Sequence, residues 1–234
     1  FLSKLFTNPE KFRVYWALTM QECKDIGINS MLIVTIVSSF LGAVTCVQTA
    51  ANMENPFVPK YIISLIVRDS TILELGPTIT CVVLAGKIGS NIAGQLGTMR
   101  ITEQIDALEV MGINSPSYLV LPKMIAAMLT FPMLVTMACF LGIYGGYLAG
   151  WLTGSVTQQS YIYGLQFDFK PNYVLFALIK SVVFGFLVAS IAAFQGFYTK
   201  GGAYEVGKAS TAAVTNACIA ILIADYLLAQ LLVG

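Results

Sequence analysis

Residues 31–51 form a run of 21 residues that contains no charged side chain. An α-helix rises about 1.5 Å per residue, so this run is long enough to cross a hydrocarbon core of about 30 Å. The composition agrees, because 57% of the 234 residues are hydrophobic and only 11% are charged, whereas a soluble domain carries roughly 25% charged residues. The sequence therefore predicts an all-α integral membrane protein.

The composition also excludes several kinds of chemistry. The sequence has no histidine, which rules out Ser-His-Asp catalysis and histidine-ligated metals. The five cysteines form no Cys-x-x-Cys pair, so we expect neither a metal site nor a disulfide. A nucleotide-binding P-loop is missing around Gly86-Lys87, because Cys81 stands where the motif needs its first glycine. We predict no catalytic residue, no metal and no cofactor in this chain, which would not be an enzyme.

An N-terminal helix is predicted over residues 9–26, before the first span. Asn8-Pro9-Glu10 is a typical helix start, and Gly27 follows the expected end. Apolar residues such as Phe12 and Trp16 fall on one face, and most of the charged residues fall elsewhere. This pattern favours an amphipathic helix lying in the membrane interface. The alternative is a soluble helix packed on a partner.

Four more membrane spans are expected after residues 31–51, at 61–98, 119–151, 172–198 and 209–233. Residues 61–98 are too many for one crossing helix, and Gly76-Pro77 can break or kink it. We expect a shorter piece near the outer surface, followed by the span itself. Residues 153–171 are expected to form a polar, aromatic loop.

The distribution of Lys and Arg predicts the orientation. With the N-terminal helix in the cytoplasm, nine cations fall on the cytoplasmic side and three outside. The nine are Lys4, Lys11, Arg13, Lys24, Lys87, Arg100, Lys123, Lys200 and Lys208, and the three are Lys60, Arg68 and Lys170. Five spans then place the C-terminus outside.

Small residues recur every four positions in two spans. The longest row is Gly142, Gly146, Gly150 and Gly154, and a second row contains Gly86, Ser90 and Gly94. Small residues at this spacing let helices approach closely in lipid. We predict a tight helix interface, within the chain or across a dimer.

The sequence pattern predicts a short helix over residues 102–111, between the second and third spans. Thr102 can cap its start and Gly112 can end it. Ile101, Ile105 and Leu108 share one face, while the acidic residues Glu103, Asp106 and Glu109 share another. Such a helix suits the docking of a partner in the cytoplasm, and the alternative is an ordinary solvated helix.

Residues 73–124 resemble the signature region of the MlaE permease family. The matching motifs are Glu74-Leu75-Gly76-Pro77, Ala85-Gly86 followed by a cation, the run Glu103–Glu109, and Leu121-Pro122-Lys123. Members of this family are membrane subunits of ABC transporters that work with MCE-domain proteins to move phospholipids across the envelope of Gram-negative bacteria. One departure is Lys87, where the family usually has arginine. Lysine keeps a point charge but cannot bind a phosphate in the bidentate manner.

The resemblance implies an N-terminal interfacial helix, five spans and a homodimer in the bacterial inner membrane. It implies a partner ATPase that carries ATP and Mg, and a ring of MCE-domain subunits. Residues 102–111 would be the coupling helix that fits a groove on the ATPase, with contacts from Thr102, Glu103, Gln104, Asp106, Leu108 and Glu109. The phospholipid substrate would occupy a cavity whose wall includes Leu73, Glu74, Ile79, Val83 and Lys87.

Two other functions remain open from the residues alone. Charges inside the predicted spans are costly and often functional, so Glu74, Lys87, Lys180 and Asp225 would also suit an ion-coupled secondary transporter. A membrane scaffold without transport is the other alternative. Lys180 and Asp225 are predicted to lie at similar depth, about 12 Å below the outer ends of consecutive antiparallel spans. An ion pair between them is expected, and the alternative is that Lys180 holds a lipid phosphate.

Overall fold

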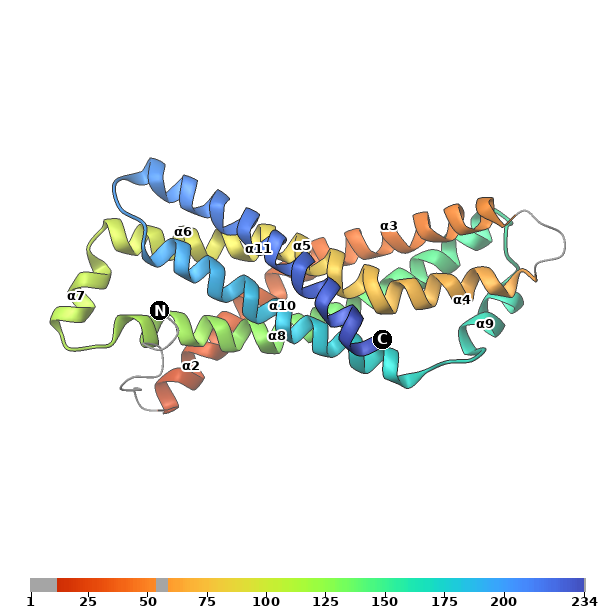
Figure 1. The fold of residues 1–234 in the computed structure, drawn as a ribbon, viewed down its shortest axis with the longest axis horizontal. Coiled ribbons are helices and arrows are strands. Elements are labelled where there is room, and N and C mark those ends of the chain that lie inside the picture. Colours follow the sequence, from red (N-terminus) through yellow and green to blue (C-terminus); the bar gives the residue numbers. More distant parts are fainter. Residues whose placement is uncertain (1–11, 54–58, 234) are drawn as a thin grey trace. The chain divides into compact units, whose positions relative to one another are not determined.

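The computed structural model describes residues 12–53 and 59–233, and every regular element in these two ranges is a helix (Figure 1). The predicted residues 9–11 of the N-terminal helix lie outside them. Labels follow Figure 1, with η for π-helical segments. The elements are α2 (Phe12–Cys23), η1 (Lys24–Ile28), α3 (Asn29–Asn52), α4 (Tyr61–Ser70), η2 (Thr71–Ile79), α5 (Thr80–Leu84), η3 (Ala85–Gly89), α6 (Ser90–Ile101), α7 (Gln104–Val110), α8 (Ser115–Leu152), α9 (Gln158–Gln166), α10 (Pro171–Phe197) and α11 (Ala203–Val233).

Five helical runs in the described part of the chain are long and apolar enough to cross a membrane. They are Val14–Asn52, Tyr61–Ile101, Ser115–Leu152, Pro171–Phe197 and Ala203–Leu231. The all-helical membrane fold predicted from the sequence is thereby confirmed. In the structure, α2 continues without a break through η1 into α3. The interfacial location of α2 stays a prediction.

Two predicted interruptions are π-helical segments in the structure. The expected helix end at Gly27 lies inside η1, and the expected break at Gly76-Pro77 lies inside η2. Proline has no N–H to donate and its ring crowds the preceding turn. A π-helical segment widens the turn, so the helix continues past Pro77 instead of ending there.

The chain divides into two compact units. Unit 1 contains residues 1–30, 81–131 and 182–234, and unit 2 contains residues 31–80 and 132–181. In unit 1, α11 packs along α6 and η3. Close approach inside this unit depends on Gly196 of α10, because a Cβ there would lie 2.6 Å from the Ala93 carbonyl oxygen of α6.

In unit 2, α3 and the second half of α8 approach each other through glycines. A Cβ on Gly145 would lie 2.2 Å from the Ser39 carbonyl oxygen, and one on Gly42 would overlap the backbone of Gly142. Gly146 faces the Tyr161 hydroxyl and Val67, and Gly150 faces Cys46. Gly154 does not belong to this interface, because it has a φ of +67° after the helix end and nothing near it. Besides Gly142 of the predicted row, the contact therefore uses Gly42 and Gly145, which the four-residue spacing did not reveal.

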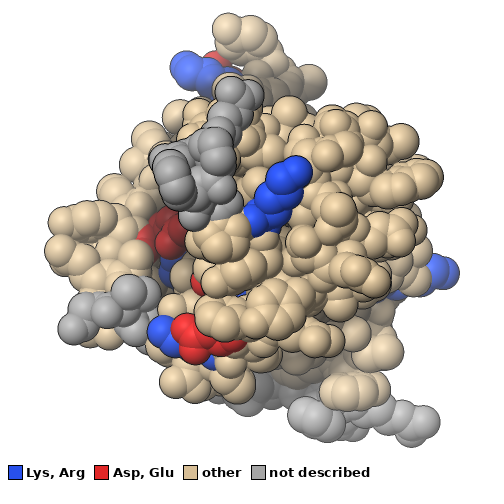
Figure 2. Space-filling view, turned by 90° about the vertical axis from the view of Figure 1, so that its right-hand side faces the viewer, with Lys and Arg blue, Asp and Glu red and all other residues tan. Residues whose placement is uncertain are grey.

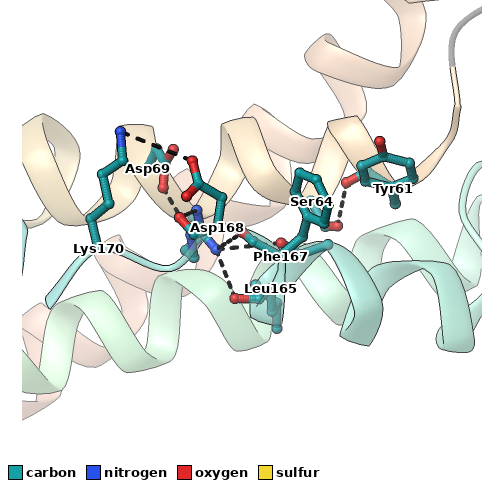
Figure 3. A network of polar contacts seen from close by, with 9 residues as sticks. Tyr61, Ser64, Asp69, Leu165, Phe167, Asp168 and Lys170 are labelled. Atoms are coloured by element: carbon teal, nitrogen blue, oxygen red, sulfur yellow. Dashed lines mark hydrogen bonds and ion pairs between the residues drawn. The ribbon is translucent and has the colours of Figure 1, made fainter.

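Residues 153–171 contain α9, which the sequence analysis expected to be a loop. Thr157 accepts a hydrogen bond from the Ser160 N–H and so caps its start. Arg68 of α4 is only 3% exposed and donates to the carbonyls of Gly164, Leu165 and Phe167 at the end of α9 (Figure 3). Its Nε also pairs with Asp69 at 2.8 Å. One buried cation therefore satisfies the free carbonyls of α9 and ties it to α4.

Tyr161 joins α9 to the apolar cluster of unit 2. Its ring packs with Cys46, Ile63, Val67 and Val156, and its hydroxyl donates to the Ile143 carbonyl at 3.0 Å. Burial raises the pKa of this hydroxyl, which keeps it a neutral donor. Figure 2, in which the right-hand side of Figure 1 faces the viewer, shows few charged side chains among uncharged ones at this end of the molecule.

The glycine contact between α3 and α8 makes a testable prediction. Gly145→Ala should lower the free energy of unfolding by about 1–3 kcal/mol, because its Cβ meets a backbone carbonyl that cannot move alone. Gly207→Ala is the matched control, since nothing lies within 4 Å of a Cβ there. Thermal unfolding in detergent measures both. Equal melting temperatures for the two variants would contradict the packing argument.

Candidate functional site

The first candidate site is α7, the short helix between α6 and α8 (Figure 1). Ile105 on its inner face is fully buried in unit 1, as the helix pattern predicted. Glu103 precedes the helix with a φ of 60°, and Gly112 follows it with a φ of +80°. These two left-handed residues set the sharp turns that lead the chain into and out of α7.

The predicted cap at Thr102 is wrong. Its hydroxyl donates to the Thr98 carbonyl at 2.8 Å, so it closes the end of α6 instead of starting α7. The residue at the start of α7 is Glu103, which makes no capping hydrogen bond with its side chain. A Ser or Thr hydroxyl can serve the turn before it as well as the turn after it, and spacing alone does not distinguish the two.

Two of the three predicted acidic docking residues have partners within unit 1. Arg100 of α6 pairs with Asp106 at 2.6 Å, and the Ser115 hydroxyl of α8 donates to Glu109 at 2.7 Å. These contacts brace α7 from both flanking helices. The side chains of Glu103, Asp106 and Glu109 remain exposed, so they keep acceptor capacity toward a partner.

The end of α7 exposes two apolar residues that the sequence analysis did not select. Val110 is 88% exposed and Met111 is 66% exposed. They follow Glu109 directly, and a charge pattern cannot identify them because they carry no charge. Two adjacent exposed apolar side chains outside the membrane-spanning runs can contribute to a protein contact.

The second candidate site is a polar contact inside unit 2. Lys180 of α10 is only 3% exposed, and its ammonium donates to Glu74 at 2.9 Å and to the Leu73 carbonyl at 3.2 Å. Pro77 lies four residues after Leu73 and has no N–H to donate to that carbonyl. Lys180 therefore supplies both a counter-ion for Glu74 and a donor for a backbone group next to the proline.

The ion pair between Lys180 and Asp225 stays a prediction. Lys180 belongs to unit 2 and Asp225 to unit 1. The partner found for Lys180 within its own unit is Glu74, which lies on a different helix from the expected one. The prediction compared the depths of charged residues on the fourth and fifth spans only. It could not reveal Glu74, which comes from the second span.

None of the five predicted cavity residues is buried in the core of a unit. Leu73, Ile79, Val83 and Lys87 are partly exposed, and Glu74 is exposed. The Lys87 ammonium has an internal partner in unit 1, the carbonyl of Asn29 at the end of η1. Their role as a cavity wall stays a prediction.

In the described residues, no cluster of acidic or cysteine side chains could hold a metal ion.

Comparison with known proteins shows the family. The model of the family described as "Permease MlaE" matches residues 19–231. This chain belongs to the MlaE permease family. It is an integral membrane permease of the ABC transporter type.

Curated relatives support this assignment over nearly the whole permease. A probable ABC transporter permease protein of Rickettsia bellii is 37% identical over 218 residues, which cover 93% of this chain and 84% of the relative. A similar protein of Synechocystis is 34% identical over 98% of this chain and 87% of its own length. The intermembrane phospholipid transport system permease protein MlaE of Haemophilus influenzae is 28% identical over 98% of this chain and 88% of its own length.

A double-mutant cycle tests the contact of Lys180 with Glu74. Lys180→Met should lower stability by about 1–3 kcal/mol, because the Leu73 carbonyl and Glu74 both lose a donor. Glu74→Gln should cost less, since an amide oxygen still accepts from the ammonium. The double variant should cost less than the sum of the two.

Thermal unfolding of the purified permease provides the measurement for the cycle. Additive effects would show that Lys180 and Glu74 act independently. The same cycle with Asp225→Asn in place of Glu74→Gln measures the predicted contact of Lys180 with Asp225.

Proposed function

We propose that this chain is the permease subunit of an ATP-driven transporter that moves phospholipids between the membranes of a Gram-negative envelope. Membership of the MlaE family supports the transport function. The assignment of phospholipid as the substrate rests on the Haemophilus influenzae relative, whose name specifies phospholipid transport. ATP and Mg would be bound by a separate ATPase subunit, because this sequence has no P-loop.

The observation that carries the proposal is the bracing of α7. Arg100 and Ser115 hold it from two membrane-spanning runs, while its acidic side chains and its apolar tip stay exposed. A partner that moves this helix would therefore move α6 and α8 with it. Transmission of this kind requires that the partner contact α7 differently in two states. We assign α7 as the coupling helix, and Val110 and Met111 join the contact residues named from the sequence.

The proposed assembly follows from the same assignment. With the N-terminus and α7 in the cytoplasm of the inner membrane and the C-terminus in the periplasm, the ATPase subunit meets α7. A ring of MCE-domain subunits would meet the periplasmic side, and a second copy of the permease would complete a homodimer. Positive charge supports this orientation, since nine of the twelve cations assigned to one side of the membrane or the other fall on the side of α7.

The phospholipid path is proposed along the second membrane-spanning run. Within unit 1 this run has partly exposed or exposed small and polar residues at Gly86, Lys87, Ser90, Asn91 and Gly94. Polar side chains in a span normally face protein or a water-filled cavity, because contact with lipid tails is costly. This stripe, together with Leu73, Glu74, Ile79 and Val83, is proposed to line the cavity.

Transfer of labelled phospholipid between vesicles tests the proposal. The complex of permease, ATPase and MCE-domain subunits should move lipid with ATP, and an inactive ATPase should abolish the transfer. Mass spectrometry of lipid bound to the purified complex identifies the substrate. Transfer driven by an ion gradient without ATP would support the secondary transporter instead. A complex that binds ATPase but moves no lipid would support the scaffold.

The apolar tip of α7 gives a separate prediction. Val110→Asp with Met111→Asp should release the ATPase subunit, because a charged tip loses the apolar contact area. Glu103→Lys with Asp106→Lys should also release it, by reversing the charge of the acidic face. Val110→Leu with Met111→Leu is the matched control and should retain the ATPase. Co-purification from detergent measures all three, and full ATPase recovery with both charged pairs would exclude α7 as the docking element.

A further inference from the structure

The signature Leu121-Pro122-Lys123 has no role in the coupling contact or the lipid path described above. Lys123 lies near the start of α8 in unit 1 and is only 6% exposed. Its ammonium donates to Glu22 of α2 and to Gln95 of α6, the latter at 2.8 Å. A buried lysine costs stability unless its charge is paired, and here it joins three helices.

A second contact ties α2 to the same part of α8. The hydroxyls of Tyr15 and Ser117 lie 2.6 Å apart, and both residues are buried. Tyr15, Thr19, Glu22 and Ile26 follow each other at intervals of four, three and four residues, so they share one face of a helix. The buried face of α2 is therefore the face that carries both bonds to α8. Trp16 and Met20 are exposed on the remaining surface.

The same first turns of α8 also hold α7. Ser115 donates to Glu109 of α7, two residues before Ser117 contacts Tyr15. Over the nine residues 115–123, α8 is thus bonded to α7, α2 and α6. A displacement of α7 that moves this part of α8 must either carry α2 along or break these bonds.

We propose that Lys123 is a positioning residue that makes α2 part of the coupling apparatus. It fixes α2 to the segment of α8 that receives the motion of α7. This inference rests on the proposed function, in which an ATPase drives α7. The exposed apolar side chains of α2 lie in the membrane interface under that function, so the motion of α7 reaches the inner leaflet through α2 as well as through the spans. Lys123 itself touches neither the ATPase nor the lipid.

The test uses the complete complex with its ATPase and MCE-domain subunits in lipid nanodiscs. Lys123→Met removes both bonds of the ammonium, and Lys123→Arg keeps the charge. Glu22→Lys with Lys123→Glu reverses the pair, and the amide of Gln95 can then donate to the carboxylate introduced on α8. Lys208→Met is the matched control, because Lys208 is exposed on α11. Three quantities are measured: hydrogen exchange of the α2 amides, ATPase binding, and phospholipid moved per ATP hydrolysed in vesicles.

In Lys123→Met, the α2 amides should exchange about tenfold faster, as expected for the loss of a charge-assisted bond. Lipid moved per ATP should fall, while the ATPase stays bound and active. Lys123→Arg and the reversed pair should restore both values, and Lys208→Met should not change them. If Lys123→Met cannot be purified, Glu22→Gln takes its place in the test. This variant leaves the helix contacts in place and should give a smaller change in the same direction.

Unchanged α2 exchange and unchanged lipid per ATP in Lys123→Met would overturn the proposal. Loss of ATPase binding in that variant would overturn it too, because Lys123 would then support docking itself. The failure of the proposed function is a different result: the unmodified complex would move no phospholipid, although α2 exchange would still respond to Lys123.

Discussion

A chain that crosses lipid has to satisfy its own backbone hydrogen bonds, because the hydrocarbon offers no donor or acceptor. The first span, α3, does so with a regular helix whose hydroxyls bond back to carbonyls four residues earlier, as in Thr35 to Met31 and Thr45 to Leu41. The second run is less regular, because Pro77 and two π-helical segments interrupt its α-helical bonding pattern. Lys180 donates to the Leu73 carbonyl beside that proline, and Lys87 donates to the Asn29 carbonyl where η1 ends. The positions of these lysines thus follow from the irregular backbone as much as from charge.

The five spans could be predicted because length and hydropathy are nearly sufficient when the backbone has to be internally bonded. The π-helical segments could not, since a glycine or proline can equally end a helix, kink it or widen one turn, and the packing around it decides. Helix α9 was missed for a related reason. It has only nine residues, and the bonds that secure its end come from Arg68, about 100 positions earlier in the sequence. The cap at Thr157 was the one local signal for it.

The candidate site shows the same division between local and distant information. The buried and exposed faces of α7 follow from helical spacing, so Ile105 and the acidic residues were placed correctly on opposite faces. The partners of those acidic residues did not follow, because Arg100 and Ser115 come from the two flanking helices. A sequence pattern that looks like a surface for one partner can therefore also be a set of internal braces. In α7 the two roles are compatible, since a carboxylate accepts several hydrogen bonds at once.

Three lysines of this chain share one mode of binding. Lys87, Lys123 and Lys180 each reach oxygen atoms of a different segment of their own unit. A lysine ammonium sits on a flexible stem and can direct its three donors to separate acceptors. At position 87, where the family usually has arginine, lysine suffices for the internal contact, because a single carbonyl at the end of η1 needs only one donor. The two remaining N–H groups of Lys87 still match a phosphate oxygen of a lipid. The internal bond therefore holds the ammonium beside the proposed lipid path without using up its capacity to bind there.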